Sequence, residues 1–124
     1  MPSTMKDLVA EARANVATVT PQEALDSGDL ILDVREPAEL GQSGAVPGAL
    51  LVPRGTLEMR ADASAETAEP RLVERMGTGR VHVLCAAGGR AAMAADTLRR
   101  MGYDATVIEG GMAGWKKAGL PVET

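Results

Sequence analysis

The stretch "VHVLCAAGGRAAMAADTLRRMG", residues 81–102, joins three patterns that decide the fold. Its opening apolar run predicts a buried strand, and its alanine-rich part predicts a helix that begins near Gly89 and ends at Gly102. The inward face of that helix is expected to consist of Ala92, Ala95, Leu98 and Met101. Between strand and helix stands Cys85, the only cysteine of the chain.

The segments on either side repeat this order of strand and helix. Apolar runs predict strands within "LILDVRE" (30–36), at 49–52 and within "ATVIEGG" (105–111). Helices are predicted for "TPQEALDSG" (20–28), for "EPAEL" (36–40), for "MAGWKKAG" (112–119), and once or twice within 56–76, with breaks near 61–64 and at Pro70. Strands separated by helices predict one open α/β domain with a parallel sheet and helices on both faces.

The N-terminal segment predicts a further helix. Thr4 and Asp7 are spaced as a capping box. The apolar positions that follow at helical spacing are Met5, Leu8, Val9, Ala12 and Val16. We expect an amphipathic helix packed against the rest of the domain.

Composition excludes several classes of function. Of 124 residues, 45% are hydrophobic and 24% charged, as in globular proteins, and the net charge of -4 argues against nucleic acid or an anionic membrane as partner. No apolar run is long enough to span a membrane and no signal-peptide pattern is present, so a cytoplasmic location is expected. With one His, one Cys and dispersed carboxylates, we expect neither a metal site nor a cofactor.

The loop from Cys85 to Arg90, called the Cys85 loop below, has the features of an anion cradle. It lies at the carboxyl edge of the predicted sheet, where ligands of such folds bind. Gly88 and Gly89 permit strained backbone angles, so the amides of residues 86–90 can turn toward the sulfur. Inward amides and a helix N-terminus favour an anion, here the thiolate of Cys85. The guanidinium of Arg90 can hold loop carbonyls, a carboxylate or an oxyanion.

At this point the chain resembles the rhodanese-like (sulfurtransferase) family, whose active-site loop reads C-x-x-G-x-R. Cys85, Gly88 and Arg90 match it. Three further segments match in order: "DVREPAEL" (33–40), "GAVPGALLVP" (44–53) and "MGYDATVIEGGMAGWKKAGLP" (101–121). The resemblance implies a rhodanese-like open parallel sheet over residues 18–124, with residues 1–17 as an appended helix.

The resemblance also implies a persulfide relay with Cys85 as the nucleophile. A small sulfur-containing anion such as thiosulfate, or a protein persulfide, would be the donor, and a thiol or cyanide the acceptor. Substrate would bind at the loop residues Ala86, Ala87, Gly88, Gly89 and Arg90. A persulfide suits inward N–H groups as the thiolate does.

Two alternatives stay open. The domain could serve as a slow sulfur-relay or protein-binding module, or as a phosphatase-like hydrolase. Related phosphatases have a cysteine loop one residue longer, whereas Arg90 follows Cys85 by five positions, so the phosphatase ranks last. The chain also departs from the family pattern: Ala45 replaces a histidine, Leu84 a tyrosine and Ala91 a serine.

Other polar residues are expected to have structural roles. Asp33 and Arg35 end a strand at the edge that carries Cys85, and the resemblance implies that they tie loops together. Arg54 is a candidate anion-guiding charge over the pocket, although an exposed arginine is the simpler account. His82 and Trp115 are expected to be buried structural residues, and Lys116 and Lys117 a solvated helix end.

Overall fold

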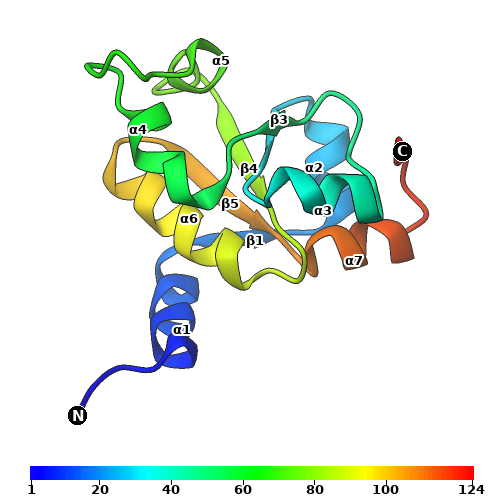
Figure 1. Cartoon of the computed structure of the whole chain (residues 1–124), viewed down its shortest axis with the longest axis horizontal. Helices are drawn as coiled ribbons and strands as arrows, with labels where there is room; N and C mark the ends of the chain where they lie inside the picture. Colours follow the sequence, from blue (N-terminus) through cyan, green and yellow to red (C-terminus); the bar gives the residue numbers. More distant parts are fainter.

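The computed structural model describes all 124 residues, which fold into one layer of strands between two layers of helices (Figure 1). The strands are β1 (Ala17–Val19), β2 (Leu30–Asp33), β3 (Leu50–Leu51), β4 (Arg80–Leu84) and β5 (Asp104–Ile108). The helices are α1 (Met5–Asn15), α2 (Pro21–Ser27), α3 (Pro37–Ser43), the 3-10 turn η1 (Arg54–Thr56), α4 (Leu57–Ala61), α5 (Pro70–Val73), α6 (Gly89–Arg100) and α7 (Gly111–Lys117).

The sheet is parallel throughout, with strand order β1-β5-β4-β2-β3. The predicted open parallel α/β fold is therefore confirmed. The predicted strand at 49–52 is present over Leu50–Leu51, and 56–76 holds two short helices, α4 and α5. No helix of the structure is both long enough and apolar enough to cross a membrane.

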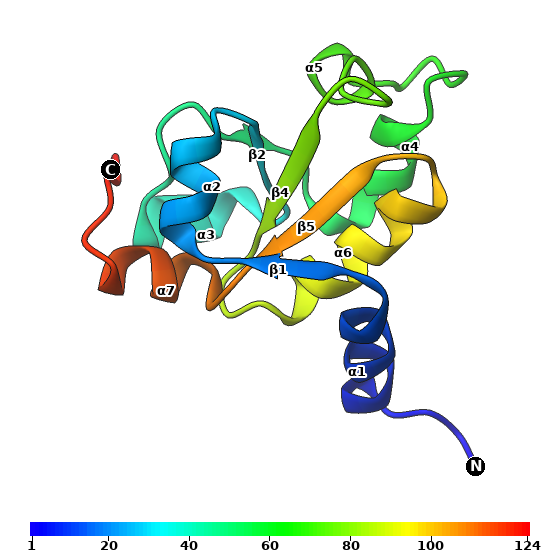
Figure 2. The same ribbon diagram turned by 180° about the vertical axis from the view of Figure 1, so that it is seen from behind.

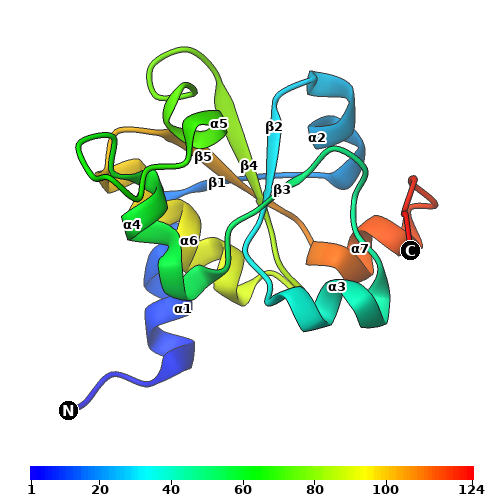
Figure 3. The same ribbon diagram turned by 45° about the horizontal axis from the view of Figure 1, so that its top comes forward.

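Strands β2, β4 and β5 are buried on both faces, and their alternate side chains belong to two different hydrophobic clusters. Val81 and Val83 join a large cluster with α1, α4 and α6, whereas Leu84 points to a smaller cluster with α2 and α7. Figure 3 shows these two groups of helices on opposite sides of the sheet. His82 lies buried between Thr106 and Ser27, so its predicted structural role agrees with its contacts.

The N-terminal helix differs from its prediction in two respects. The capping box of Thr4 and Asp7 is present, and the helix packs on α6. The prediction of its buried apolar face is wrong in part, because the side chains of Met5 and Leu8 are 76% and 44% exposed. Val16 is not helical: it has extended backbone and leads into β1, a strand that the sequence pattern did not predict.

Candidate active site

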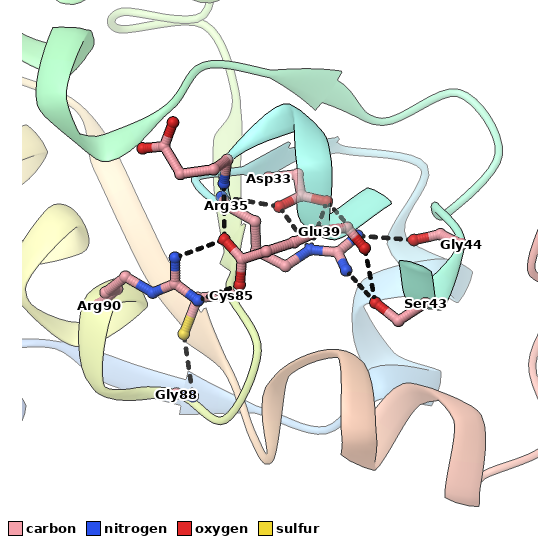
Figure 4. Close-up of polar contacts among 9 residues, drawn as sticks. Asp33, Arg35, Glu39, Ser43, Gly44, Cys85, Gly88 and Arg90 are labelled. Atoms are coloured by element: carbon pink, nitrogen blue, oxygen red, sulfur yellow. Dashed lines mark hydrogen bonds and ion pairs between the residues drawn. The ribbon is translucent and has the colours of Figure 1, made fainter. Parts of the chain in front are cut away.

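Cys85 follows β4 directly and its side chain is buried, with 1% of its surface exposed. Its Sγ accepts a hydrogen bond of 2.9 Å from the backbone N–H of Gly88, the residue that precedes α6 (Figure 4). Gly88 has φ of 116°, a value that side chains other than glycine rarely adopt. The expected cradle is thus present at one amide, while the other loop amides make no hydrogen bond to the sulfur.

The first turn of α7 fixes the backbone of the Cys85 loop. The N–H of Met112 donates to the carbonyl of Cys85 at 2.7 Å, and the N–H of Ala113 donates to the carbonyl of Ala86 at 3.3 Å. An α-helix leaves its first N–H groups without internal partners, so α7 can satisfy these two carbonyls. As a result they point toward α7, away from the sulfur.

Arg90 holds a carboxylate that the sequence interpretation did not single out. Its Nη1 and Nη2 lie 2.8 and 2.7 Å from the two carboxylate oxygens of Glu39 on α3 (Figure 4). Arg90 lowers the pKa of Glu39 from 4.5 to about 2, and the backbone N–H of Glu36 acts in the same direction. Glu39 in turn raises the pKa of Arg90. The pair is ionised at neutral pH, so Arg90 ties α6 to α3.

Asp33 and Arg35 form a buried ion pair beneath α3. Asp33 Oδ2 lies 2.8 Å from Arg35 Nη2, and Asp33 Oδ1 accepts the backbone N–H of Arg35 at 3.0 Å. The guanidinium also donates to Ser43 Oγ and to the carbonyl of Gly44, both at 2.8 Å. Since α3 runs from Pro37 to Ser43, Arg35 anchors the end of the helix that carries Glu39.

Arg54 lies apart from the Cys85 loop. Its guanidinium pairs with Glu58 at 2.9 Å and with Thr97 Oγ1 at 3.4 Å. It lines an open depression of about 260 Å³ between α1 and α6 whose lining does not include the Cys85 loop. The structure therefore does not bring Arg54 together with Cys85.

Lys116 is the cation that borders the Cys85 loop in place of Arg54. An open depression of about 280 Å³ is lined by Ala86, Ser43, Met112, Ala113 and Lys116. The sequence interpretation placed Lys116 on a solvated helix end; it is exposed, and it also borders the Cys85 loop. Trp115, its neighbour on α7, is fully buried as expected. No group of three or more His, Cys, Asp and Glu side chains is arranged to hold a metal ion.

The chain is similar to proteins of one family over most of its length. A family model described as "Rhodanese-like domain" matches residues 20–118. The polysulfide-sulfur transferase homodimer of Wolinella succinogenes is 31% identical, with 94% of this chain and 85% of that chain covered and a TM-score of 0.71. A rhodanese-related protein of Thermoplasma volcanium is 27% identical over 86% and 96% of the chains, with a TM-score of 0.70.

One similar structure has a different description. A protein of unknown function from Rhodopseudomonas palustris, named as a possible tyrosine phosphatase, is 34% identical over 99% of both chains, with a TM-score of 0.88. Because 99% of this chain is covered, the similarity extends over nearly all of residues 1–17, which lie outside the matched family model.

Proposed function

The chain belongs to the rhodanese-like domain family, and from that premise we propose that it is a sulfurtransferase that carries a sulfane sulfur as a persulfide on Cys85. The Cys85 thiolate attacks the outer sulfur of a donor such as thiosulfate. The S–S bond of the donor breaks, sulfite leaves with the electron pair, and Cys85 becomes a persulfide. An acceptor such as cyanide then attacks the terminal sulfur, thiocyanate leaves, and the thiolate is restored.

The observation that carries this proposal is the hydrogen bond from the Gly88 N–H to Cys85 Sγ at the start of α6. A backbone N–H at a helix N-terminus stabilises negative charge on the sulfur without a general base. The carbonyls of Cys85 and Ala86 are bound to α7, so they do not face the anion. The same surroundings suit a thiolate and a persulfide.

The persulfide could also be loaded by a carrier rather than by a small anion. The sulfur is buried, and the loop side chains Ala86 and Ala87 are small and neutral. A low-molecular-weight persulfide or a protein persulfide is therefore included as a donor in the experiment below. A loading reaction with these and not with thiosulfate would identify a relay protein.

Phosphatase chemistry is the second candidate because of the relative from Rhodopseudomonas palustris. Two observations favour sulfur transfer over it. Arg90 follows Cys85 by five positions, which makes the loop one residue shorter than the phosphatase loops of related folds. The carboxylate nearest the loop arginine, Glu39, has a pKa of about 2, so it is ionised and cannot protonate a leaving group.

The proposal predicts a persulfide that depends on Cys85. After incubation with thiosulfate, the intact mass of the protein should increase by one sulfur atom, and cyanide or dithiothreitol should remove it. Cys85→Ser should gain no sulfur while keeping the wild-type circular dichroism spectrum, because the serine side chain is nearly the same size.

Three outcomes of this experiment would contradict the proposal. Loading of Cys85→Ser would exclude Cys85 as the carrier. Failure of the wild-type protein to load from thiosulfate and from persulfide donors would reject sulfur transfer altogether. Hydrolysis of p-nitrophenyl phosphate that disappears in Cys85→Ser, without any sulfur loading, would favour the phosphatase.

A further inference from the structure

Helix α1 lies outside the matched family region, yet it reaches the Cys85 loop. It packs against α6 through half-buried Val9 and buried Ala12. Figures 1 and 2 show from opposite sides that its N-terminal end projects from the domain. Two distances show how close it comes. A Cβ built on Gly89 would lie 3.8 Å from Val9 Cγ2, and one built on Gly88 would lie 3.0 Å from Arg13 Nη2. The Arg13 guanidinium therefore sits against the residue whose N–H binds Cys85 Sγ.

Arg13 is a cation without a partner. Its side chain makes no hydrogen bond and no ion pair within the chain. Arg90 and Arg35 differ, because each holds a carboxylate through two or more hydrogen bonds. Glu39 already neutralises the charge of Arg90 and occupies two of its five N–H groups, whereas no N–H group of the Arg13 side chain is bound within the chain.

The surface beside Arg13 is shaped for an apolar group. An open groove of about 470 Å³ runs between α1 and the start of α6, lined by Met5, Lys6, Val9, Ala10, Arg13 and Gly89. Lys6 also has no ion-pair partner. Two unpaired cations at an apolar groove are complementary to an organic anion.

We propose that this groove is the binding site for a small organic sulfane-sulfur donor, with Arg13 on its acid group and α1 against its apolar body; the proposal rests on the sulfurtransferase activity proposed above. A thiosulfonate has this chemistry. The Cys85 thiolate attacks its terminal sulfur, the S–S bond breaks, and the sulfinate leaves with the electron pair as Cys85 becomes a persulfide. Arg13 binds the sulfonyl oxygens and the departing sulfinate.

The test compares two donors, benzenethiosulfonate and thiosulfate, with cyanide as acceptor. Thiosulfate offers an acid group and no apolar body, so the wild-type protein should have the lower KM for benzenethiosulfonate. Arg13→Ala should raise both KM values about tenfold or more, as expected for the loss of a charge-assisted hydrogen bond. Arg13→Lys should recover part of that loss. Added salt should raise the KM values of the wild-type protein more than those of Arg13→Ala, because it screens the charge of Arg13.

Two further variants distinguish donor binding in the groove from general effects of lost charge or altered folding. Ala10→Trp, at an exposed position, should fill the groove and raise the KM for benzenethiosulfonate alone. Arg75→Ala is the matched control, because Arg75 precedes β4 and so lies at the opposite edge of the sheet from Cys85. It should keep both KM values.

The outcomes distinguish this proposal from the proposed function. If the wild-type protein turns over donors while Arg13→Ala has the KM values of Arg75→Ala, the groove proposal is overturned and sulfur transfer stands. An Ala10→Trp variant that affects both donors equally would also overturn it. Absence of loading from every donor in the wild-type protein would reject the proposed function itself.

Discussion

At the scale of single residues, the ion pair of Glu39 and Arg90 fixes the end of the Cys85 loop against α3. Both side chains are partly exposed, at 30% and 39%, so solvent screens the pair and its contribution to stability is about 1 kcal/mol or less. Its two hydrogen bonds nevertheless fix the orientation of the guanidinium. The pair therefore matters for the position of α6 against α3, and the sulfur lies at the start of α6.

Glu39→Gln should remove an acid-sensitive part of the protein's stability. Folding lowers the pKa of Glu39 from 4.5 to about 2, so between these values the unfolded chain binds more protons at this group than the folded protein. The contribution of the pair is complete above pH 4.5 and is lost as the pH falls toward 2. Urea unfolding of both proteins across this range should show a stability difference that shrinks with falling pH. A stability difference between the two proteins that stays constant from pH 4.5 to 2 would contradict the low pKa of Glu39.

At the scale of elements, the site is an assembly of α6, α3 and α7 around the end of β4. The first turn of α7 reaches the Cys85 loop because Gly111 has no side chain: a Cβ there would lie 2.5 Å from the carbonyl oxygen of Cys85. Gly111 also has φ of 58°, in the left-handed region. Both the backbone angle and the close approach require glycine at this position.

Gly111→Ala should disturb the loop as well as the fold. Gly28→Ala is its matched control, because Gly28 has φ of 72° but nothing within 4 Å of a built Cβ. The control should lose about 1 kcal/mol of stability from backbone strain alone and keep full sulfur transfer. Gly111→Ala should lose more stability and most of its activity. Equal stability and activity in the two variants would show that the α7 contact with the loop is unimportant.

Elements with strong local patterns could be predicted from the sequence, and those made by distant contacts could not. The helix from Gly89 and the strand before Cys85 have continuous patterns of their own. Strand β1 has only three residues and exists through pairing of Ala17 with Thr106 in β5. Glu39 was missed for the same reason, because its partner Arg90 comes from a distant helix; its spacing from Glu36 signals only a helix start.

At the scale of the molecule, the two faces of the sheet are unequal. One cluster holds twenty buried residues, and the other holds seven, including Trp115. The chain has no Phe and one Trp, so the smaller core has few large side chains to replace this one. Trp115 also donates from Nε1 to the carbonyl of Pro121 at 2.8 Å, which holds the C-terminal segment on α7. Trp115 is thus the largest side chain that packs α7, the helix that orients the Cys85 loop, against the sheet.

Trp115→Ala should destabilise the whole molecule by about 3–5 kcal/mol, the cost of deleting a large buried ring. That is a large part of the 5–15 kcal/mol that stabilises a typical domain. Because both clusters contain side chains of β2, β4 and β5, unfolding in urea should remain a single transition by circular dichroism and by hydrogen exchange of β4 amides. Leu98→Ala in the larger cluster is the comparison, with an expected loss of about 2–5 kcal/mol. A loss below about 1 kcal/mol for Trp115→Ala, or a separate early transition confined to α7, would show that the smaller core does not hold the fold together.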